Sequence, residues 1–450
     1  MIFKLPSKLR ALALSAAVAG TLLHPGAARA MSLVQAFEAA LANDTTYRQA
    51  AQDAIAGKEY TTLGRAGLLP NVQASYSANR NRVDLEAPNF LGQKQTTHPE
   101  YVSRSTAVTL RQTLFNMDAW ARYKQGIAQT GFSDESFAGR GQDLITRVIG
   151  AYMDALFASE QVRIATAQRD MYAEQKAVND LLFAKGEGTR TDMLETQSRL
   201  DLSEAQLLEA TDAQQTQLAT LSAIVGSDVT ALDELGPNFR IADMPEGGFE
   251  AWRKIALEEN PDLRAQTFAI EASRQEVNKS RAGHMPRVDF IASYAKADSE
   301  TINTYNQNTL NRSIGIQVVV PLYSGGSVNA ASRQSVAGLE KAKAELQLRT
   351  DRIMIELRKQ HASVISSAAR IRALEKAVGS GELLVKATEQ SIKGGVRINL
   401  DLLNARQQLY TSMRDLAQAR YTYLVSRLRL RAAAGVAGPD DVREVAAYFR

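Results

Sequence analysis

The segment that decides the fold occurs twice in the chain. Arg65-Ala66-Gly67-Leu68-Leu69-Pro70-Asn71-Val72 returns in the same order as Arg281-Ala282-Gly283-His284-Met285-Pro286-Arg287-Val288. In both copies a helical pattern reaches Gly, Pro stops it, and an alternation of polar and apolar residues begins. Alternation with period two predicts a strand. The copies lie about 210 residues apart, a period far longer than that of any solenoid repeat, so each marks the passage from a long helix into a strand in one half of a duplicated chain.

Working outward from each proline, the pattern predicts one hairpin in each half. The first half has alternating segments at about 70–82 and 103–115, and the second half has them at about 286–297 and 312–323. Each segment has a weak, one-sided apolar face, which is typical of the strands of roughly ten residues that cross a membrane in a barrel. The smallest membrane barrels have about eight strands, so the four strands of one chain are too few. We therefore expect several copies to share one barrel.

Very long helices are predicted after each hairpin. From about residue 327 to residue 393 only Gly379 and Gly381 interrupt the helical pattern, so this helix reaches roughly 100 Å at about 1.5 Å per residue. An ordinary antiparallel bundle shows such a pattern too, but a bundle has no need for two hairpins. We predict a mainly α fold with a small β part. Apolar residues recur at sevens, which favours coiled-coil packing: Leu339, Leu346 and Ile353, then Leu357, Val364, Ile371, Val378 and Val385.

The chain is predicted to consist of a leader, two repeats, a linker and a tail. Residues 1–30 have a basic start, an apolar run and Ala28-Arg29-Ala30, which together predict a secretory signal peptide that is cut before Met31. The remaining predicted parts are the first repeat at 31–226, a linker or equatorial segment at 227–250, the second repeat at 251–435 and a C-terminal tail at 436–450.

Composition argues against several other functions. The chain has no cysteine and a net charge of only +4, so we expect no disulfide, no thiolate metal site and no nucleic-acid partner. The histidines lie too far apart to form a ligand set. The sequence has neither a Gly-x-x-x-x-Gly-Lys-Ser/Thr phosphate loop nor a Gly-x-Ser-x-Gly nucleophile motif. We expect no enzyme activity, no cofactor and no metal, so that any energy for transport comes from a partner. The histidines are His24, His98, His284 and His361.

Three segments together carry a resemblance to the TolC family of outer-membrane exit ducts. Residues 65–70, at the end of the first helical pattern, resemble the family's helix-to-barrel junction. Gly395-Val396-Arg397, followed by Asp401-Leu402-Leu403-Asn404-Ala405, resembles its periplasmic turn, and Ala419-Arg420-Tyr421-Thr422-Tyr423-Leu424 resembles its last helix. The match extends over nearly all of the predicted mature chain, in both repeats. Each segment alone is a weak signal, but their order and duplication are specific.

The resemblance implies a homotrimer in the outer membrane of a Gram-negative bacterium. Three chains would form a transmembrane β-barrel of twelve strands, four from each chain, surrounded by outer-membrane lipid. They would also form a long coiled-coil helical barrel in the periplasm. In the family, inward-bent helix pairs close the periplasmic tip. The tip opens when an inner-membrane transporter and its periplasmic adaptor (membrane fusion) protein dock.

The family's gate residues correspond to particular positions of this sequence. The tip arginine corresponds to Arg397, and its partners from the first repeat correspond to Thr191 and Asp192. The tip tyrosine corresponds to Ile392, which has no hydroxyl, so the gate is expected to depend more on the pair of Arg397 and Asp192. Without the resemblance, these two residues are interpreted as solvated charges at helix ends, each contributing under ~1 kcal/mol.

The family's constriction acids correspond to Asp401 and Asn404. Asp401 keeps a carboxylate, whereas Asn404 replaces the second acid. A trimer would therefore carry one ring of carboxylates at this level instead of two. A carboxylate ring in a narrow pore concentrates cations and repels anions, so this replacement is expected to weaken cation selectivity.

The start of the first long helix indicates a branch of the family. Asp118-Ala119-Trp120-Ala121-Arg122-Tyr123 and the junction at 65–70 resemble the type I secretion branch. We therefore expect an exit duct for a protein substrate, opened by docking of an inner-membrane ABC transporter and an adaptor. The nearest alternative is the outer channel of a tripartite drug or metal efflux pump, with a proton-driven pump as partner. A third interpretation is a soluble periplasmic coiled-coil scaffold.

Overall fold

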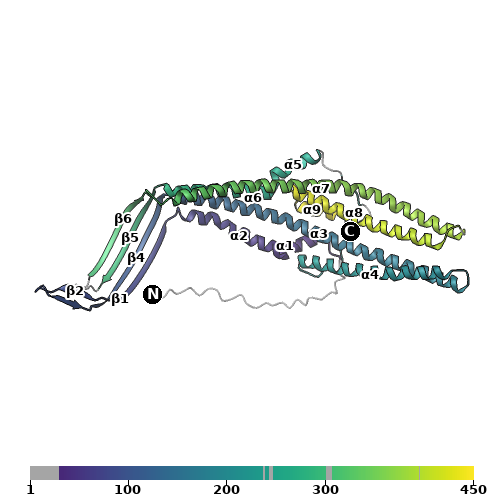
Figure 1. Cartoon of the computed structure of the whole chain (residues 1–450), viewed down its shortest axis with the longest axis horizontal. Coiled ribbons are helices and arrows are strands. Elements are labelled where there is room, and N and C mark those ends of the chain that lie inside the picture. Colours follow the sequence, from purple (N-terminus) through teal and green to yellow (C-terminus); the bar gives the residue numbers. More distant parts are fainter. Residues whose placement is uncertain (1–29, 237–238, 243–246, 300–306, 395) are drawn as a thin grey trace, which may run out of the picture.

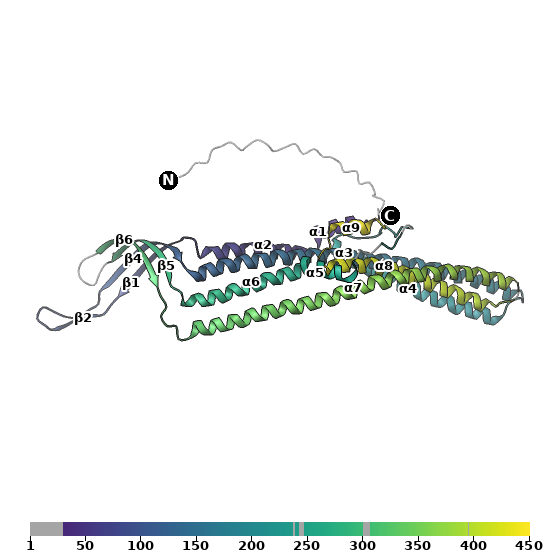
Figure 2. The same cartoon turned by 90° about the horizontal axis from the view of Figure 1, so that it is seen from above.

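The structure is a computed structural model that describes residues 30–236, 239–242, 247–299, 307–394 and 396–450. The predicted signal peptide, apart from Ala30, lies outside the described residues. The molecule is elongated, with a β-sheet at one end and a pair of helix turns at the other (Figures 1 and 2). The mainly α fold with a small β part is therefore confirmed.

Helices account for most of the chain and run along its long axis (Figure 1). The two longest, α3 and α7, each extend from the sheet to the far tip and return as α4 and α8. A short 3₁₀ turn at Ala282–His284 precedes the second hairpin. The helices are α1 (Leu33–Asn43), α2 (Thr45–Ala66), α3 (Met117–Ala184), α4 (Arg190–Val225), α5 (Gly248–Glu259), α6 (Pro261–Arg281), α7 (Ser327–Lys393), α8 (Asn399–Ala433) and α9 (Pro439–Ala446).

The main sheet combines both hairpins into one antiparallel surface in the order β1-β4-β5-β6. The central pairing of β4 with β5 joins the two halves of the chain, for example through Val108 opposite Tyr294. A second, two-stranded sheet of β2 and β3 extends from the end of the first hairpin. The strands are β1 (Asn71–Arg82), β2 (Leu85–Pro88), β3 (Lys94–Thr97), β4 (Glu100–Phe115), β5 (Arg287–Ser299) and β6 (Gln307–Val319).

The strand bounds differ from the sequence prediction at one place in particular. The last strand was predicted at about 312–323, but β6 spans Gln307–Val319. Pro321 explains the early end, because proline has no N–H to donate to a strand ladder. The strand begins earlier because Gln307 to Asn311 pair with β5, although their side chains are mostly polar. Strand pairing here depends on the neighbouring strand rather than on apolar alternation.

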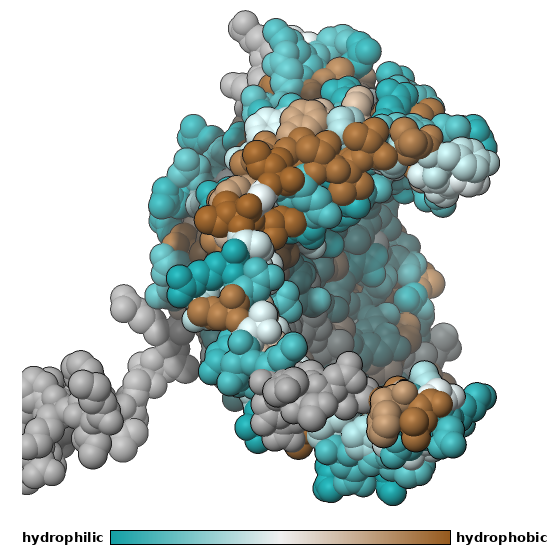
Figure 3. Space-filling view, turned by 90° about the vertical axis from the view of Figure 1, so that its left-hand side faces the viewer, coloured by the Kyte–Doolittle hydropathy of each residue, from teal (hydrophilic) through white to brown (hydrophobic). Residues whose placement is uncertain are grey.

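Among the described residues, the outer strands of the main sheet, β1 and β6, each pair on one side only. On β6, alternating apolar side chains are exposed: Ile314 by 79%, Ile316 by 66% and Val318 by 59%. Figure 3 views the molecule from the strand end and shows apolar side chains gathered in a band there. A strand with a free edge and an exposed apolar face is a template for pairing with another chain.

Two glycines allow α2 and α3 to pack closely. A methyl group at Gly64 would lie 2.7 Å from the carbonyl oxygen of Arg122, and one at Gly126 would lie 2.3 Å from that of Tyr60. Both distances are shorter than van der Waals contact with the backbone of the facing helix. The helices can therefore approach as they do only because neither position has a side chain.

The main hydrophobic core lies near the middle of the molecule and takes buried side chains from α1, α3, α4, α5, α7, α8 and α9. The side chains of Leu144, Ile149, Tyr152 and Tyr423 are at most 1% exposed there. A capping box of Ser32 and Gln35 begins α1 and positions its buried face against this core. Among the residues described, no helix is both long and apolar enough to cross a bilayer.

Candidate functional site

The predicted gate residues belong to the two helix turns at the tip, the end of the molecule far from the sheet (Figure 1). The first turn joins α3 to α4, and Gly186 there has a φ of 75°. Thr189 begins α4: its hydroxyl accepts the main-chain N–H of Asp192 at 3.1 Å and donates to the Asp192 carboxylate at 2.6 Å. The second turn leads into α8, and the N-cap residue before that helix, Ile398, makes no side-chain cap. The first turn is therefore capped more firmly than the second.

The described part of one chain does not bring Arg397 and Asp192 together. Arg397 is exposed, and within the residues described its guanidinium forms no ion pair. The carboxylate of Asp192 is instead bound by Thr189, and Thr191 beside it is exposed. Ile392 is half-buried near the end of α7. The structure of one chain therefore shows no contact between Arg397 and Asp192, and these gate residues stay predictions.

The two predicted constriction residues lie one turn apart on α8. Asp401 is in the first turn, where a carboxylate is stabilised by the positive end of the helix dipole. The amide oxygen of Asn404 accepts a hydrogen bond from the Arg199 guanidinium of α4 at 3.2 Å. Asn404 therefore joins α8 to α4 within one chain, a contact that sequence reasoning did not find.

A set of six polar residues, here called the tip network, connects the four helices at this end. The Arg406 guanidinium lies 2.6 Å from the Glu389 carboxylate, joining α8 to α7. It also lies 3.5 Å from the amide oxygen of Gln175, which joins α8 to α3. The Gln175 amide donates to Asn399 at 3.2 Å, giving a second link from α3 to α8. The tip network consists of Gln175, Asn179, Thr196, Glu389, Asn399 and Arg406.

The deepest part of the tip network joins α3 to α4. Asn179 is 5% exposed and Thr196 is 0% exposed, and the Asn179 amide donates to the Thr196 hydroxyl at 2.6 Å. The Asn399 amide nitrogen, by contrast, is buried and has no hydrogen-bond partner among the residues described. A buried network that is only partly satisfied gains less than a complete one. These contacts hold the two helix pairs together, but less firmly than a fully satisfied network would.

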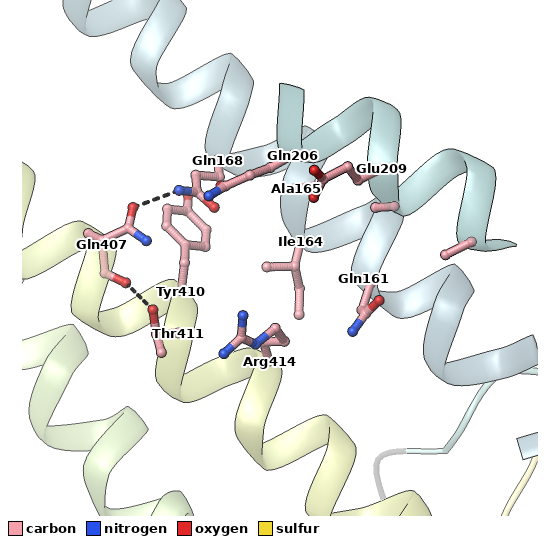
Figure 4. A pocket seen from close by; sticks show the side chains of 12 residues that line it. Gln161, Ile164, Ala165, Gln168, Gln206, Glu209, Gln407, Tyr410, Thr411 and Arg414 are labelled. Atoms are coloured by element: carbon pink, nitrogen blue, oxygen red, sulfur yellow. Dashed lines mark hydrogen bonds between the residues drawn. The ribbon is translucent and has the colours of Figure 1, made fainter. Parts of the chain in front are cut away.

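A second polar layer lies closer to the middle of the molecule (Figure 4). The Gln168 amide of α3 donates to the amide oxygen of Gln407 of α8 at 2.7 Å, and the Tyr172 hydroxyl donates to the same oxygen at 3.2 Å. Burial raises the pKa of Tyr172 above its ordinary value, so its hydroxyl remains a donor. The layer borders a cleft of about 430 Å³ between α3, α4 and α8.

The spacing along α3 was the signal that could have revealed both layers. Gln168, Tyr172, Gln175 and Asn179 recur at steps of four, three and four, so they occupy one face of the helix. That face packs against α8, where coiled-coil helices normally have apolar residues. Polar residues at such positions indicate specificity at a cost in stability. Within the residues described, no group of three or more His, Asp or Glu side chains could hold a metal ion.

The chain thus combines a long helical part, a sheet whose outer strands have free edges, and a polar tip, which is the architecture expected of one subunit of a channel-tunnel. A family model described as "Outer membrane efflux protein" matches residues 36–227 and 252–436. The chain therefore belongs to the outer membrane efflux protein family, whose members are channels rather than enzymes. It is an outer-membrane protein, and its long helical part lies in the periplasm.

Relatives and a solved structure agree with this assignment. The chain is 41% identical to the alkaline protease secretion protein AprF of Pseudomonas aeruginosa, over 93% of this chain and 88% of the relative. It is 38% identical to the proteases secretion protein PrtF of Dickeya chrysanthemi, over 95% of this chain and 93% of the relative. The Campylobacter jejuni CmeC outer membrane channel shares the fold with a TM-score of 0.79 and 16% identity, over 93% and 90% of the two chains. Both of these relatives are named for the secretion of proteases.

Proposed function

We propose that this protein is the outer-membrane component of a type I secretion system and that it works as a homotrimer. The relatives named for protease secretion, similar over nearly their whole length, are the observation that carries the proposal. The free edges of β1 and β6 support the trimer, because each chain can pair its β6 with β1 of the next. Three sheets would close one barrel of twelve strands within outer-membrane lipid.

We infer that the partners are a periplasmic adaptor and an inner-membrane ABC transporter. The chain has no phosphate-binding loop of its own, so the energy for export comes from the transporter. The cargo is a protein, and a secreted protease is the class that the relatives' names support. A wide duct contacts its cargo weakly, so the transporter selects the cargo.

The proposed gate has one part within each chain and one part between chains. The tip network and the layer around Gln407 hold the pair α7–α8 against the pair α3–α4 of the same chain. Arg397, which is exposed, pairs with Asp192 and Thr191 of a neighbouring chain, since its planar fork can bridge two partners. Docking of the adaptor and the transporter opens the tip by separating the helix pairs.

Asp401 forms the proposed constriction ring. Three copies of this carboxylate around a narrow pore attract cations and repel anions. Asn404 adds no charge and is already bound by Arg199 of its own chain. The ring therefore has one carboxylate from each chain.

Deletion of the gene in its own host, followed by analysis of the culture medium, tests this function. We expect one or a few secreted proteins to disappear from the medium and to return when the wild-type gene is supplied. Crosslinking before purification should recover an ABC transporter and an adaptor with the chain. An unchanged set of secreted proteins, together with a proton-driven pump in the crosslinked complex, would contradict the proposal and favour drug or metal efflux.

A further inference from the structure

Met31 is held beside the segment that connects the two halves of the chain. Its main-chain N–H donates to the carbonyl oxygen of Ala231 at 2.9 Å, and Met31 forms a parallel β-bridge with Leu232. Its own carbonyl oxygen accepts the hydroxyl of Tyr152 at 2.9 Å. Both main-chain polar groups of Met31 therefore have partners from distant parts of the sequence.

Tyr152 connects Met31 to the rest of the core. Its side chain is 0% exposed, and its hydroxyl also accepts the main-chain N–H of Asp233 at 3.2 Å. The ring of Phe449 packs edge-on against the ring of Tyr152, with 6.0 Å between the ring centres. Residue 233 and residue 31 thus both bind one buried oxygen atom.

The charge near this oxygen is negative. Burial raises the pKa of Tyr152 far above its ordinary value, and the carboxylate of Asp233 adds to the shift. Tyr152 therefore stays neutral, and its hydroxyl always has a proton to donate to Met31. The main-chain N–H of Asp233 and the carbonyl oxygen of Met31 are both hydrogen-bonded to this hydroxyl, so Asp233 and Met31 are neighbours in space.

The helix that follows prevents Met31 from moving. Ser32 begins α1 with its capping box, and Leu33 is 1% exposed in the main core. A shift of one residue along this segment would break the cap and would move Leu33 out of the core. Met31 therefore has a fixed position relative to Ala231 and Asp233.

We propose that Met31, Tyr152, Ala231 and Asp233 form a binding site for the charged N-terminus that leader removal creates. In that step water adds across the peptide bond between Ala30 and Met31. The bond between carbon and nitrogen breaks, the carboxylate remains on Ala30, and the nitrogen of Met31 leaves as an amine that takes up a proton. A single N–H donor is thereby replaced by an ammonium group with three.

The groups that already surround the Met31 nitrogen can also bind the new ammonium group. One N–H keeps the hydrogen bond to the Ala231 carbonyl, which becomes charge-assisted and therefore stronger. The positive charge of the ammonium group also attracts the carboxylate of Asp233, a residue that binds the same tyrosine hydroxyl as Met31. Removal of the leader therefore strengthens the contact between the start of the mature chain and the linker segment, in the centre of the molecule. Maturation and final folding are linked through this site, independently of the gate.

The proposal can be tested with an insertion that moves the N-terminal positive charge away from Met31 without changing the fold. Two glycines placed between Ala30 and Met31 keep Ala28-Arg29-Ala30 for cleavage, but they turn the Met31 ammonium back into an amide. We expect the purified mature variant to unfold at a temperature lower by about 2 °C or more than the wild type. N-terminal sequencing of the wild type should begin at Met31.

A double-mutant cycle assigns the effect to Asp233. Asp233→Asn should lower the melting temperature of the wild type and should have little further effect in the glycine-insertion variant. The matched control is Asp228→Asn, at an exposed position of the same linker. It should change the melting temperature of neither the wild type nor the insertion variant. Equal melting temperatures for the wild type and the insertion variant, or a mature chain that begins elsewhere than Met31, would overturn the proposal.

Discussion

The guanidinium of Arg406 lies 2.6 Å from the carboxylate of Glu389. The Arg406 side chain is only 20% exposed, so solvent screens the pair less than it screens a surface ion pair. Glu389 is on α7 and Arg406 is on α8, and the same guanidinium faces Gln175 of α3. Arg406 is therefore one of the residues that join the second helix pair to the first at the tip, together with Asn399 and Asn404.

Removing Arg406 should loosen the tip without unfolding the molecule. Arg406→Ala leaves Glu389 and Gln175 without a shared partner, at a cost of about 1–3 kcal/mol in the stability of the tip. Amide hydrogen exchange should become faster at residues 175–199 and 389–406 and stay unchanged in the central core. Arg372→Ala, at an exposed position of α7, is the control. Equal exchange in both variants would show that the tip network does not hold the helix pairs together.

The constriction ring should control ion selectivity. Asp401→Ala removes the only carboxylate proposed for the ring, so it should lower cation selectivity. The reversal potential under a salt gradient in a planar bilayer measures this effect. Glu187→Gln, an exposed acid in the first tip turn, serves as the control for a general loss of negative charge. An Asp401→Ala channel with the reversal potential of the wild type would place the ring elsewhere.

A second acid at position 404 should raise cation selectivity, but the Arg199 guanidinium should limit the rise. Asn404→Asp adds one carboxylate to each chain, beside the Arg199 guanidinium that already binds this position. Pairing with Arg199 offsets part of the new charge. We expect cation selectivity to rise moderately in Asn404→Asp and to rise further when Arg199→Gln is added. An identical reversal potential in the single and double variants would show that Arg199 does not offset the new charge.

The close packing of α2 on α3 should be sensitive to a single methyl group. Gly126→Ala would place its methyl 2.3 Å from the Tyr60 carbonyl oxygen, and such overpacking costs typically about 1–3 kcal/mol. Thermal unfolding should therefore occur at a lower temperature. Gly141→Ala lies in the same helix with nothing within 4 Å of the new methyl, so it should be neutral or stabilising, since Ala favours a helix by about 1 kcal/mol over Gly. Similar melting temperatures for the two variants would contradict the packing argument.

The sequence predicted the elements whose signals are local and repeated. The helix-to-strand junctions at Pro70 and Pro286 and the long sevenfold helices follow from proline chemistry and from periodicity. The extent of β6 was less predictable, because Gln307 to Asn311 join the sheet through their neighbours in β5 rather than through an apolar pattern.

In the candidate site, too, some residues could be predicted from the sequence and others could not. Resemblance predicted Arg397, Asp192 and Asp401, but the partners seen within one chain, such as Arg199 for Asn404, come from helices about 200 residues away. Such pairs depend on which helix faces meet, which a single sequence does not specify. The polar face of α3 was visible in the sequence as a break in the apolar pattern, and only the structure shows that α8 completes it.

Single-channel conductance of the purified protein in a planar bilayer tests the central claim most directly. The account predicts a low-conductance channel for the wild type and a higher conductance for Arg397→Ser, which removes the contact between chains. The double variant Arg397→Ser with Arg406→Ala, which also removes the contact within each chain, should conduct more than either single variant. A wild type that forms no channel, or a double variant with the conductance of the wild type, would contradict a tunnel closed at its tip by these two sets of contacts.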